Sequence, residues 1–298
     1  MTHWKPAELK TSELRALADM RGWQFLDCCP LCSDKSFNPF FLGRDRCVLC
    51  RCADCGIVFL NPRPASSRYE PGWLQKRYLP KSIERGFFSP DLKPDLPRIY
   101  EKYRKIADMA AMLKPKEPVV DIGCGIGLSM LALKHKGIRS IGVEVDHEFL
   151  TFARDTLGLQ VRYHDVTAEP LEQRTDVATM NSVLEHVEDP VGFLSAIRRN
   201  ILAKPRFGRS GALALTVPNL MSLEFLRDGR EWRVITGDHL WYFTEDSLAM
   251  VAKRAGFEVE HIQRESRAPQ GLEIFHTYVH DILGVDRNTR GGIGMILR

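Results

Sequence analysis

Short apolar runs alternate with longer amphipathic stretches from about residue 98 to the end of the chain. The runs are rich in Val, Ile and Leu and too short for helices, so they predict buried strands. Strands separated by helices pair in parallel, and the helices cover both faces of the sheet. We therefore expect an α/β fold with a doubly wound, mostly parallel sheet. The predicted strands are residues 119–122, 140–143, 159–163, 176–180 and 211–217, with 292–298 as a candidate final strand.

Helix start and stop signals fit between these strands. Residues 98–113 show a helical period of apolar positions. Asp189 is an expected N-cap for residues 190–202, which begin with a proline, the residue favoured in the first turn. Thr244 opens a further predicted helix, and Gly256 closes it.

The first hundred residues lack this alternation. Residues 6–20 predict a short helix, and residues 23–60 hold most of the cysteines among short β-like runs. Seven prolines lie within residues 61–97, which excludes long helices and predicts an extended connector. Aromatic side chains in this connector indicate that it packs against another part of the protein. The expected parts are a small module at 1–63, a proline-rich connector at 64–97 and an α/β domain at 98–298.

Composition and charge exclude several classes of protein. With 298 residues, 44% hydrophobic side chains and 27% charged ones, the chain fits a globular protein and not a disordered or collagenous one. No apolar run reaches the roughly 18 residues of a membrane helix, and no apolar leader opens the chain, so we expect a cytoplasmic protein without a membrane span. In residues 1–100, 16 Lys and Arg against 11 Asp and Glu leave a charge of only +5, which is too weak to predict nucleic acid as a partner.

Seven of the eight cysteines fall between Cys28 and Cys55. Clustered cysteines without a secretion signal indicate metal ligands rather than disulfides. Two C-x₂-C pairs separated by nineteen residues match a four-thiolate zinc site, and four protein ligands leave no open position, so we expect structural zinc. The expected ligands are Cys29, Cys32, Cys52 and Cys55, whereas Cys28, Cys47 and Cys50 are alternatives, because Cys47 and Cys50 form a third such pair.

Three glycines directly follow the first predicted strand, in Gly123-Cys-Gly-Ile-Gly127. Glycine permits a sharp turn and a close approach to a ligand, and the following helix presents free N–H groups. A dinucleotide fingerprint would need a small residue where Leu128 stands, and the acid Asp121 would repel a pyrophosphate. Glu144 ends the next strand, where a carboxylate can accept hydrogen bonds from ribose hydroxyls. The loop therefore indicates a cationic ligand that carries a nucleoside.

These residues resemble a class I S-adenosylmethionine-dependent methyltransferase over about residues 98–298. The resemblance rests on Asp121-Ile-Gly-Cys-Gly-Ile-Gly127, Gly142-Val-Glu144, Asp176-Val-Ala-Thr-Met-Asn-Ser-Val-Leu-Glu-His186, Val187-Glu-Asp-Pro190 and Leu215-Thr-Val-Pro-Asn219. The segment Cys52-Ala-Asp-Cys-Gly-Ile-Val-Phe-Leu-Asn-Pro-Arg-Pro64 is similar to a zinc-ribbon segment that precedes this domain in one branch of the family. That branch is associated with small molecules, sugars and cell-surface or secondary metabolites. The resemblance implies a Rossmann-like sheet with a small N-terminal zinc-binding module.

The resemblance also implies roles for single residues in holding S-adenosylmethionine. The carboxylate of Asp121 and the backbone of Gly123, Gly125 and Gly127 would hold the methionine end. Glu144 would bind the ribose, and Val145 would pack on the adenine. Asp165 would accept a hydrogen bond from the adenine amino group with Val166 beside it, and Asn181 would lie near the methionine end.

Methyl transfer to a hydroxyl or an enolisable carbon also needs a base, and histidine suits that role near neutral pH. His239 lies between the fifth predicted strand and the next helix, at the carboxyl edge where doubly wound folds bind substrates. His186 follows the fourth predicted strand. We favour His239 as the base over His186, although either can be a structural histidine. Trp232, Trp241 and Tyr242 are candidate walls of the substrate pocket, and packing in the core is an equal alternative for them.

Related quinone O-methyltransferases bind a divalent metal through the glutamate and histidine of Leu-Glu-His and an acid three residues before that glutamate. Ser182 stands at this position, so we do not expect a catalytic metal. The expected function is methyl transfer to a small-molecule substrate, in the first place O-methylation of a sugar or a related metabolite.

Two other functions are alternatives to this one. An RNA methyltransferase would use the zinc module to grip nucleic acid. The Asn-Pro-Pro-Tyr/Phe-type motif of base amino-methylases is absent, because Asn181-Ser-Val-Leu stands in its place. The third hypothesis is a binding module that retains the fold without activity.

Overall fold

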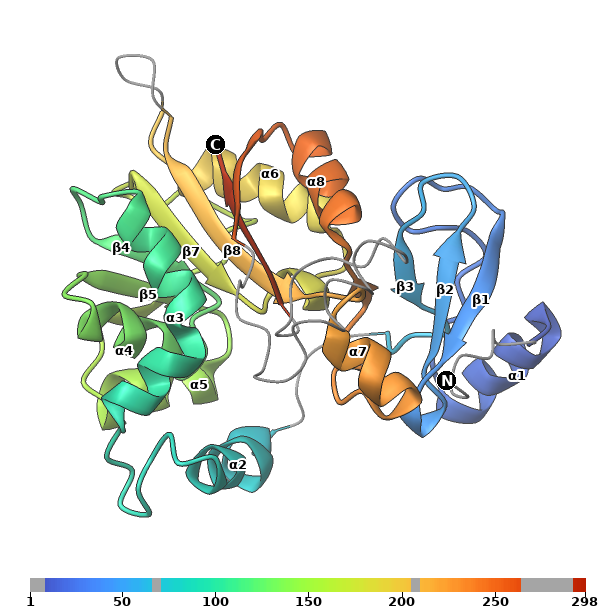
Figure 1. Cartoon of the computed structure of the whole chain (residues 1–298), viewed down its shortest axis with the longest axis horizontal. Helices are drawn as coiled ribbons and strands as arrows, with labels where there is room; N and C mark the ends of the chain where they lie inside the picture. The colour runs from blue at the N-terminus through green and yellow to red at the C-terminus, as the bar shows by residue number, and fades with distance from the viewer. Residues whose placement is uncertain (1–8, 66–70, 205–209, 264–291) are drawn as a thin grey trace, which may run out of the picture.

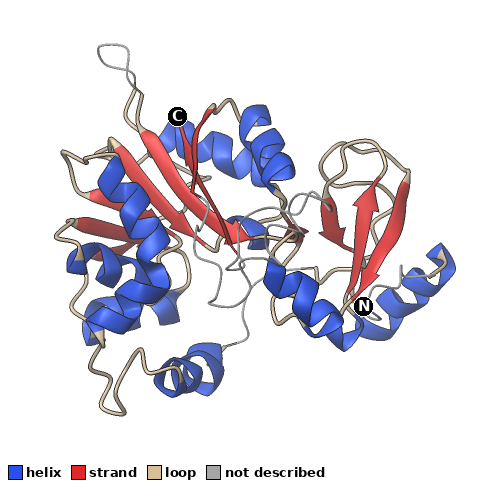
Figure 2. Ribbon diagram, in the orientation of Figure 1, coloured by secondary structure: helices blue, strands red, loops and turns tan. Residues whose placement is uncertain are grey.

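Seven strands form the larger of two β-sheets in the computed structural model, which describes residues 9–65, 71–204, 210–263 and 292–298 (Figures 1 and 2). In spatial order these strands are β10 (Val259–Gln263), β11 (Gly292–Leu297), β8 (Ala212–Pro218), β7 (Val177–Asn181), β4 (Val119–Ile122), β5 (Ser140–Glu144) and β6 (Val161–Tyr163). The five strands from β8 to β6 run parallel, and β11 is antiparallel to both of its neighbours. The predicted doubly wound, mostly parallel sheet is confirmed.

Helices cover both faces of this sheet. They are α3 (Leu96–Met112), α4 (Leu128–His135), α5 (His147–Thr151) with its continuation η3 (Phe152–Thr156), α6 (Pro190–Asn200) and α8 (Glu245–Arg254). Figure 1 shows α3, α4 and α5 on one face and α6 and α8 on the other. In β4, Val119 packs in the core with α3 and α4, whereas Val120 and Ile122 pack with α6 and α8. Successive side chains of a strand point to opposite faces, so one buried strand serves both cores.

Capping side chains determine where these helices begin. Asp189 accepts a hydrogen bond from the Gly192 amide at the start of α6, and Thr244 forms a capping box with Ser247 at the start of α8. Asp95 caps α3 in the same way, so this helix begins two residues before the predicted start. Within the described ranges, no helix combines the length and apolar character that crossing a bilayer requires.

The cysteine-rich segment forms most of a second, antiparallel sheet. Its elements are α1 (Thr11–Arg21), β1 (Phe37–Leu42), η1 (Arg44–Arg46), β2 (Val48–Cys52) and β3 (Val58–Leu60). The fourth strand, β9 (Trp241–Tyr242), comes from the far end of the chain and pairs with β3. We call α1 and β1–β3 the cysteine-rich module. Its sheet is thus completed by a strand from the α/β part of the chain.

An apolar cluster also joins the module to the segment between β8 and β9, which contains α7 (Leu223–Asp228) and η5 (Gly229–Glu231). The rings of Phe41 in β1 and Phe225 in α7 have centroids 5.2 Å apart. Of the two roles open to Trp232, Trp241 and Tyr242, the structure shows packing in the core, where each is at most 2% exposed. These large rings hold the two sheets together.

The proline-rich connector is helical in part. Residues Leu74–Tyr78 form η2 and continue into α2 (Leu79–Glu84), with Pro80 in the first turn of α2. The expectation of an extended chain is therefore wrong for these residues. The expected packing is confirmed, because Phe87 and Phe88 are buried in the core with α3 and α4.

Candidate functional site

The three-glycine turn between β4 and α4 is closed tightly by its neighbours. Gly123, Gly125 and Gly127 have φ angles of 61°, 54° and 87°, which side chains other than glycine rarely adopt. A Cβ on Gly123 would lie 2.7 Å from Val183 Cγ2, and one on Gly127 would lie 2.2 Å from Leu159 Cδ1. The backbone of this turn is therefore held in one path, with the N-terminus of α4 behind it.

Asp121 lies in β4 directly below this turn and is 1% exposed. Its carboxylate accepts hydrogen bonds from the hydroxyls of Ser129 and Thr179. Burial raises the pKa of Asp121 to about 6, although the two hydroxyls lower it, and the nearby Glu144 raises it further. The turn thus rests on a buried acid whose charge a cationic ligand would stabilise.

Glu144 ends β5 and ties the glycine turn to the next loop. Its carboxylate accepts from the backbone amide of Gly125 at 2.8 Å, of Val145 at 2.8 Å and of Asp146 at 2.9 Å. Burial raises the pKa of Glu144, while these three amides lower it. An ionised carboxylate offers about four lone-pair sites, so one stays available to a hydroxyl donor.

The other residues implied for an adenosine lie around the same edge. Val145 is 53% exposed next to Glu144, so its side chain offers apolar surface for an aromatic ring. Asp165 accepts from both the hydroxyl and the amide of Thr167, and these bonds lower the pKa of Asp165. Val166 turns its side chain into the core instead, where it is 3% exposed. Asn181 ends β7, and its side-chain oxygen accepts from the Thr216 hydroxyl at 2.6 Å.

A second group of polar side chains follows β7. Glu185, His186 and His239 have ligand atoms within 4.8 Å of one another, and we call these three residues the Glu–His cluster. Glu185 and His186 lie on the single turn η4 (Leu184–His186), whereas His239 directly precedes β9. The structure thus brings together the two histidines that the sequence suggested separately.

Glu185 is the least solvated member of the Glu–His cluster. It is 0% exposed, and neither carboxylate oxygen has a hydrogen-bond partner. Burial raises the pKa of Glu185 to about 7, and the neighbouring His186 opposes this shift. The sequence pointed to Glu185 only as part of the Leu-Glu-His motif. Its complete burial could not be predicted, because that burial depends on contact with the distant segment around His239.

The two histidines of the cluster are in different environments. His186 Nδ1 lies 2.8 Å from the backbone oxygen of Asp238. A carbonyl oxygen only accepts, so Nδ1 carries the proton and the lone pair is on Nε2. The ring of His239 meets that of His186 edge to face with centroids 4.6 Å apart, and its Nδ1 is buried without a partner. Burial, helped by His186, lowers the pKa of His239 to about 3.

The Glu–His cluster also has the composition of a metal site. One carboxylate and two imidazoles are common ligands of zinc and other divalent cations. The sequence argument against a catalytic metal was the serine at position 182. In the structure His239, from a distant segment, supplies a third donor beside Glu185 and His186.

The four predicted zinc ligands converge in the cysteine-rich module. Cys29 Sγ lies 3.7 Å from Cys55 Sγ, and Cys32 Sγ lies 3.6 Å from Cys52 Sγ. Tetrahedral zinc with bonds of ~2.3 Å would separate its sulfur ligands by about 3.8 Å. Burial raises the pKa of Cys29 and of Cys55, so these thiols favour the protonated form unless a cation is bound. Of the alternatives, Cys47 and Cys50 are buried in the module and lie outside this group, as does Cys28.

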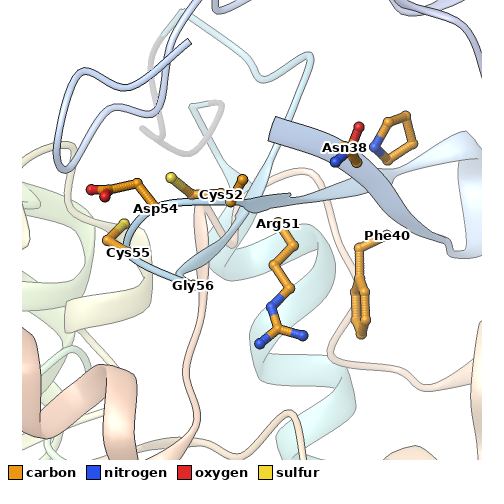
Figure 3. A pocket seen from close by; sticks show the side chains of 9 residues that line it. Asn38, Phe40, Arg51, Cys52, Asp54, Cys55 and Gly56 are labelled. Atoms are coloured by element: carbon orange, nitrogen blue, oxygen red, sulfur yellow. The ribbon is translucent and has the colours of Figure 1, made fainter. Parts of the chain in front are cut away.

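An open hollow of about 480 Å³ lies on the surface of the module beside two of these cysteines (Figure 3). Figure 3 shows the side chains of Phe40 and Arg51 extending in the same direction from neighbouring strands. The hollow is lined by residues 38–40 and 51–56 and by none of the residues around the glycine turn. It is therefore separate from both the glycine turn and the Glu–His cluster.

Comparison with known proteins agrees with this geometry. The methyltransferase domain family matches residues 96–262. A ubiquinone biosynthesis O-methyltransferase of Cereibacter sphaeroides is 31% identical over 153 residues, which are 47% of this chain and 60% of the relative. One from Methylococcus capsulatus is 37% identical over 93 residues, which are 29% of this chain and 38% of the relative. The chain thus spans at most about 60% of the length of these relatives.

A solved structure shows the same fold. It is an S-adenosylmethionine-dependent methyltransferase from Archaeoglobus fulgidus, 18% identical, with a TM-score of 0.51. The match covers 74% of this chain and 99% of that one. At this identity the likeness concerns the arrangement of the sheet and its helices, and the chemistry has to be argued from the site itself.

Proposed function

Because the chain belongs to the class I S-adenosylmethionine-dependent methyltransferases, we propose that it transfers a methyl group to a hydroxyl of a small molecule. The acceptor class we favour is a sugar or a related metabolite. The relatives named as O-methyltransferases support an oxygen as the nucleophile and add phenolic acceptors to the candidates. The observation that carries the proposal is the pair of buried acids, Asp121 and Glu144, at adjacent strand ends around the glycine turn.

We propose that S-adenosylmethionine is held as the resemblance implies. Asp121 and the turn from Gly123 to Gly127 would take the methionine end, Glu144 the ribose, and Val145 the adenine. The sulfonium supplies an activated methyl group with its own leaving group. Since the two acids lie in a region of low dielectric, they favour a cationic donor over a pyrophosphate.

The proton acceptor in this proposal is His186. The Asp238 carbonyl holds the proton on Nδ1, so Nε2 can take the proton of the methyl acceptor as its oxygen bonds to the methyl carbon and the carbon–sulfur bond breaks. The sequence favoured His239. We assign His239 a supporting role, because burial lowers its pKa to about 3 and leaves it a poor base near neutral pH. Glu185 would stabilise the imidazolium formed on His186.

A second candidate for the proton step is a divalent cation bound by the Glu–His cluster. The unpartnered oxygens of buried Glu185 favour it, since a buried carboxylate normally has a partner. Such an ion would lower the pKa of a coordinated hydroxyl. Dialysis against EDTA, followed by assay with and without added Mg²⁺, Mn²⁺ or Zn²⁺, separates the two mechanisms. Full activity without added cation supports His186 acting alone.

The methyl acceptor class is tested by a transfer assay with tritiated S-adenosylmethionine. Nucleotide sugars, phenols, quinols, lipids and RNA are offered as separate substrates. Label in a sugar or phenol supports the proposal. Label in RNA, with binding that weakens steeply with salt, would instead support the nucleic-acid alternative.

We propose that Cys29, Cys32, Cys52 and Cys55 bind one structural zinc ion, and the expected effect of single serine substitutions tests this choice. Cys52→Ser should lower the zinc content of the purified protein from about one ion per chain to near none and reduce thermal stability. Cys50→Ser, the control two residues away, should keep the zinc. The measurement is metal analysis by mass spectrometry with thermal melting. Loss of zinc in the Cys50 variant alone would contradict the assignment.

The affinity for S-adenosylmethionine is expected to fall as the pH is lowered through about 6, the pKa to which burial raises Asp121. The cation favours the ionised carboxylate, so protonation at lower pH weakens binding, by about tenfold between pH 7 and 5 if Asp121 acts alone. Near pH 6 binding should also release protons. Titration calorimetry in two buffers of different ionisation enthalpy measures both effects. Asp121→Asn should bind weakly with a flatter pH profile, and an unchanged slope would assign the effect elsewhere.

A further inference from the structure

We infer that strand β9 couples zinc coordination in the cysteine-rich module to the Glu–His cluster, and that Trp241 is a positioning residue for His186. The inference rests on the proposed function for the role of His186. The coupling itself is a matter of geometry and can be measured without a substrate. It runs from the zinc ligands to β3, from β3 to β9, and from β9 to the turn that carries Glu185 and His186.

The first step joins the zinc ligands to β3. Cys52 ends β2, and its amide donates to the Ile57 oxygen at 3.0 Å, while the Gly56 amide donates to the Cys52 oxygen at 3.2 Å. Cys55 lies inside this tight turn, three residues before β3 begins. Zinc bound to Cys52 and Cys55 would therefore fix the point at which β3 starts.

The second step joins β3 to β9. Phe59 pairs with Trp241, and their ring centroids are 6.5 Å apart. The Leu60 amide donates to the Leu240 oxygen at 3.0 Å. β9 has two residues and lies at the edge of its sheet, so within the described ranges β3 is its neighbour in that sheet. A strand this short depends on its neighbour for its position.

The third step joins β9 and the residues just before it to the Glu–His cluster and its neighbour Val187 through three hydrogen bonds. The Leu240 amide donates to the backbone oxygen of Glu185 at 2.8 Å. Trp241 Nε1 donates to the backbone oxygen of Val187 at 2.7 Å. His186 Nδ1 donates to the Asp238 oxygen at 2.8 Å. These bonds hold η4 from both sides of His186. Trp241 is 1% exposed and Val187 is half-buried, so without the Nε1–H the Val187 oxygen would lose a partly buried hydrogen bond.

The cofactor half of the site is held by other contacts. Asp121 is fixed by Ser129 and Thr179, and Glu144 by the Gly125 amide, all within the large sheet and α4. None of these bonds involves the cysteine-rich module. A change that displaces β9 should therefore alter the proton acceptor and leave the binding of S-adenosylmethionine intact. General destabilisation of the protein would weaken both.

The test uses the full-length, zinc-loaded protein labelled with ¹⁵N in its histidine rings. Trp241→Phe removes the Nε1 donor and keeps an aromatic ring. Trp232→Phe is the matched control, since Trp232 is 2% exposed and its Nε1 has no partner. In Trp241→Phe, the His186 ring nitrogens should shift from the Nδ1–H tautomer towards a mixture of tautomers. kcat should fall by about 10- to 100-fold, as for a small misplacement of a reacting group, with the Kd for S-adenosylmethionine within about twofold. Trp232→Phe should leave the His186 signals in place.

Removal of zinc by a chelator should reproduce the tautomer change of Trp241→Phe. Unaltered His186 signals in Trp241→Phe would overturn the inference. This substitution tests the inference even if the zinc-free protein unfolds. A parallel loss of S-adenosylmethionine binding would also overturn it, because the module would then support the whole fold. A tautomer change without methyl transfer to any acceptor would support the coupling and count against the proposed function, so the two failures are distinguishable.

Discussion

Replacement of His186 by alanine is expected to lower kcat about 10²- to 10⁴-fold, the usual contribution of a general base. The variant loses Nε2 of His186, whose lone pair is oriented by the hydrogen bond that Nδ1 makes to the Asp238 backbone oxygen. The affinity for S-adenosylmethionine should change by less than about twofold, because the glycine turn is held by other residues. Steady-state kinetics over a range of pH, with calorimetry for the cofactor, measures both quantities.

A His239 variant distinguishes between the two candidate bases. His239→Asn should cost less in kcat than His186→Ala, since the buried ring of His239 is a poor base. His135→Ala, on the surface of α4, is the control and should have wild-type kinetics. If the order of the two losses were reversed, the base would be His239, as the sequence alone favoured.

The structure around the glycine turn was predictable because its residues are local in the sequence. A strand, a three-glycine turn and a helix follow one another within residues 119–135, and each has its own signal. Asp121 and Glu144 sit at or near strand ends, and parallel strands place those ends at one edge of the sheet. Their burial and pKa shifts follow from the same arrangement.

The joint between the two sheets could not be predicted in this way. β9 is two residues long and pairs with residues more than 180 positions earlier in the chain. A two-residue strand has no alternation to detect, and Trp241 and Tyr242 read equally well as pocket walls or as core. The burial of Glu185 depends on this joint, because its backbone oxygen pairs with Leu240. Sequence reasoning therefore ranked the two histidines without knowing which contacts the fold would give each ring.

The connector shows a further limit of local reasoning. Its prolines exclude long helices, and the short helical stretch that does form uses Pro80 in the first turn. Composition cannot distinguish an extended chain from a short helix that contains a proline. What stabilises the helix is burial of Leu74 and Leu79 against α3 and α4, a contact between segments.

Substitution of Glu144 by glutamine should weaken S-adenosylmethionine binding about 10²-fold or more, since each hydrogen bond to a charged group contributes roughly 1.5–3 kcal/mol. Glutamine keeps the shape, but its NH₂ group cannot accept from the Gly125 amide or from a ribose hydroxyl. Thermal stability should fall as well, by about 1–3 kcal/mol, because one carboxylate oxygen that accepts from a backbone amide is lost. Glu172→Gln, an exposed control, should bind normally. Calorimetry showing affinity within about threefold of wild type for the Glu144 variant would contradict a nucleoside at this edge.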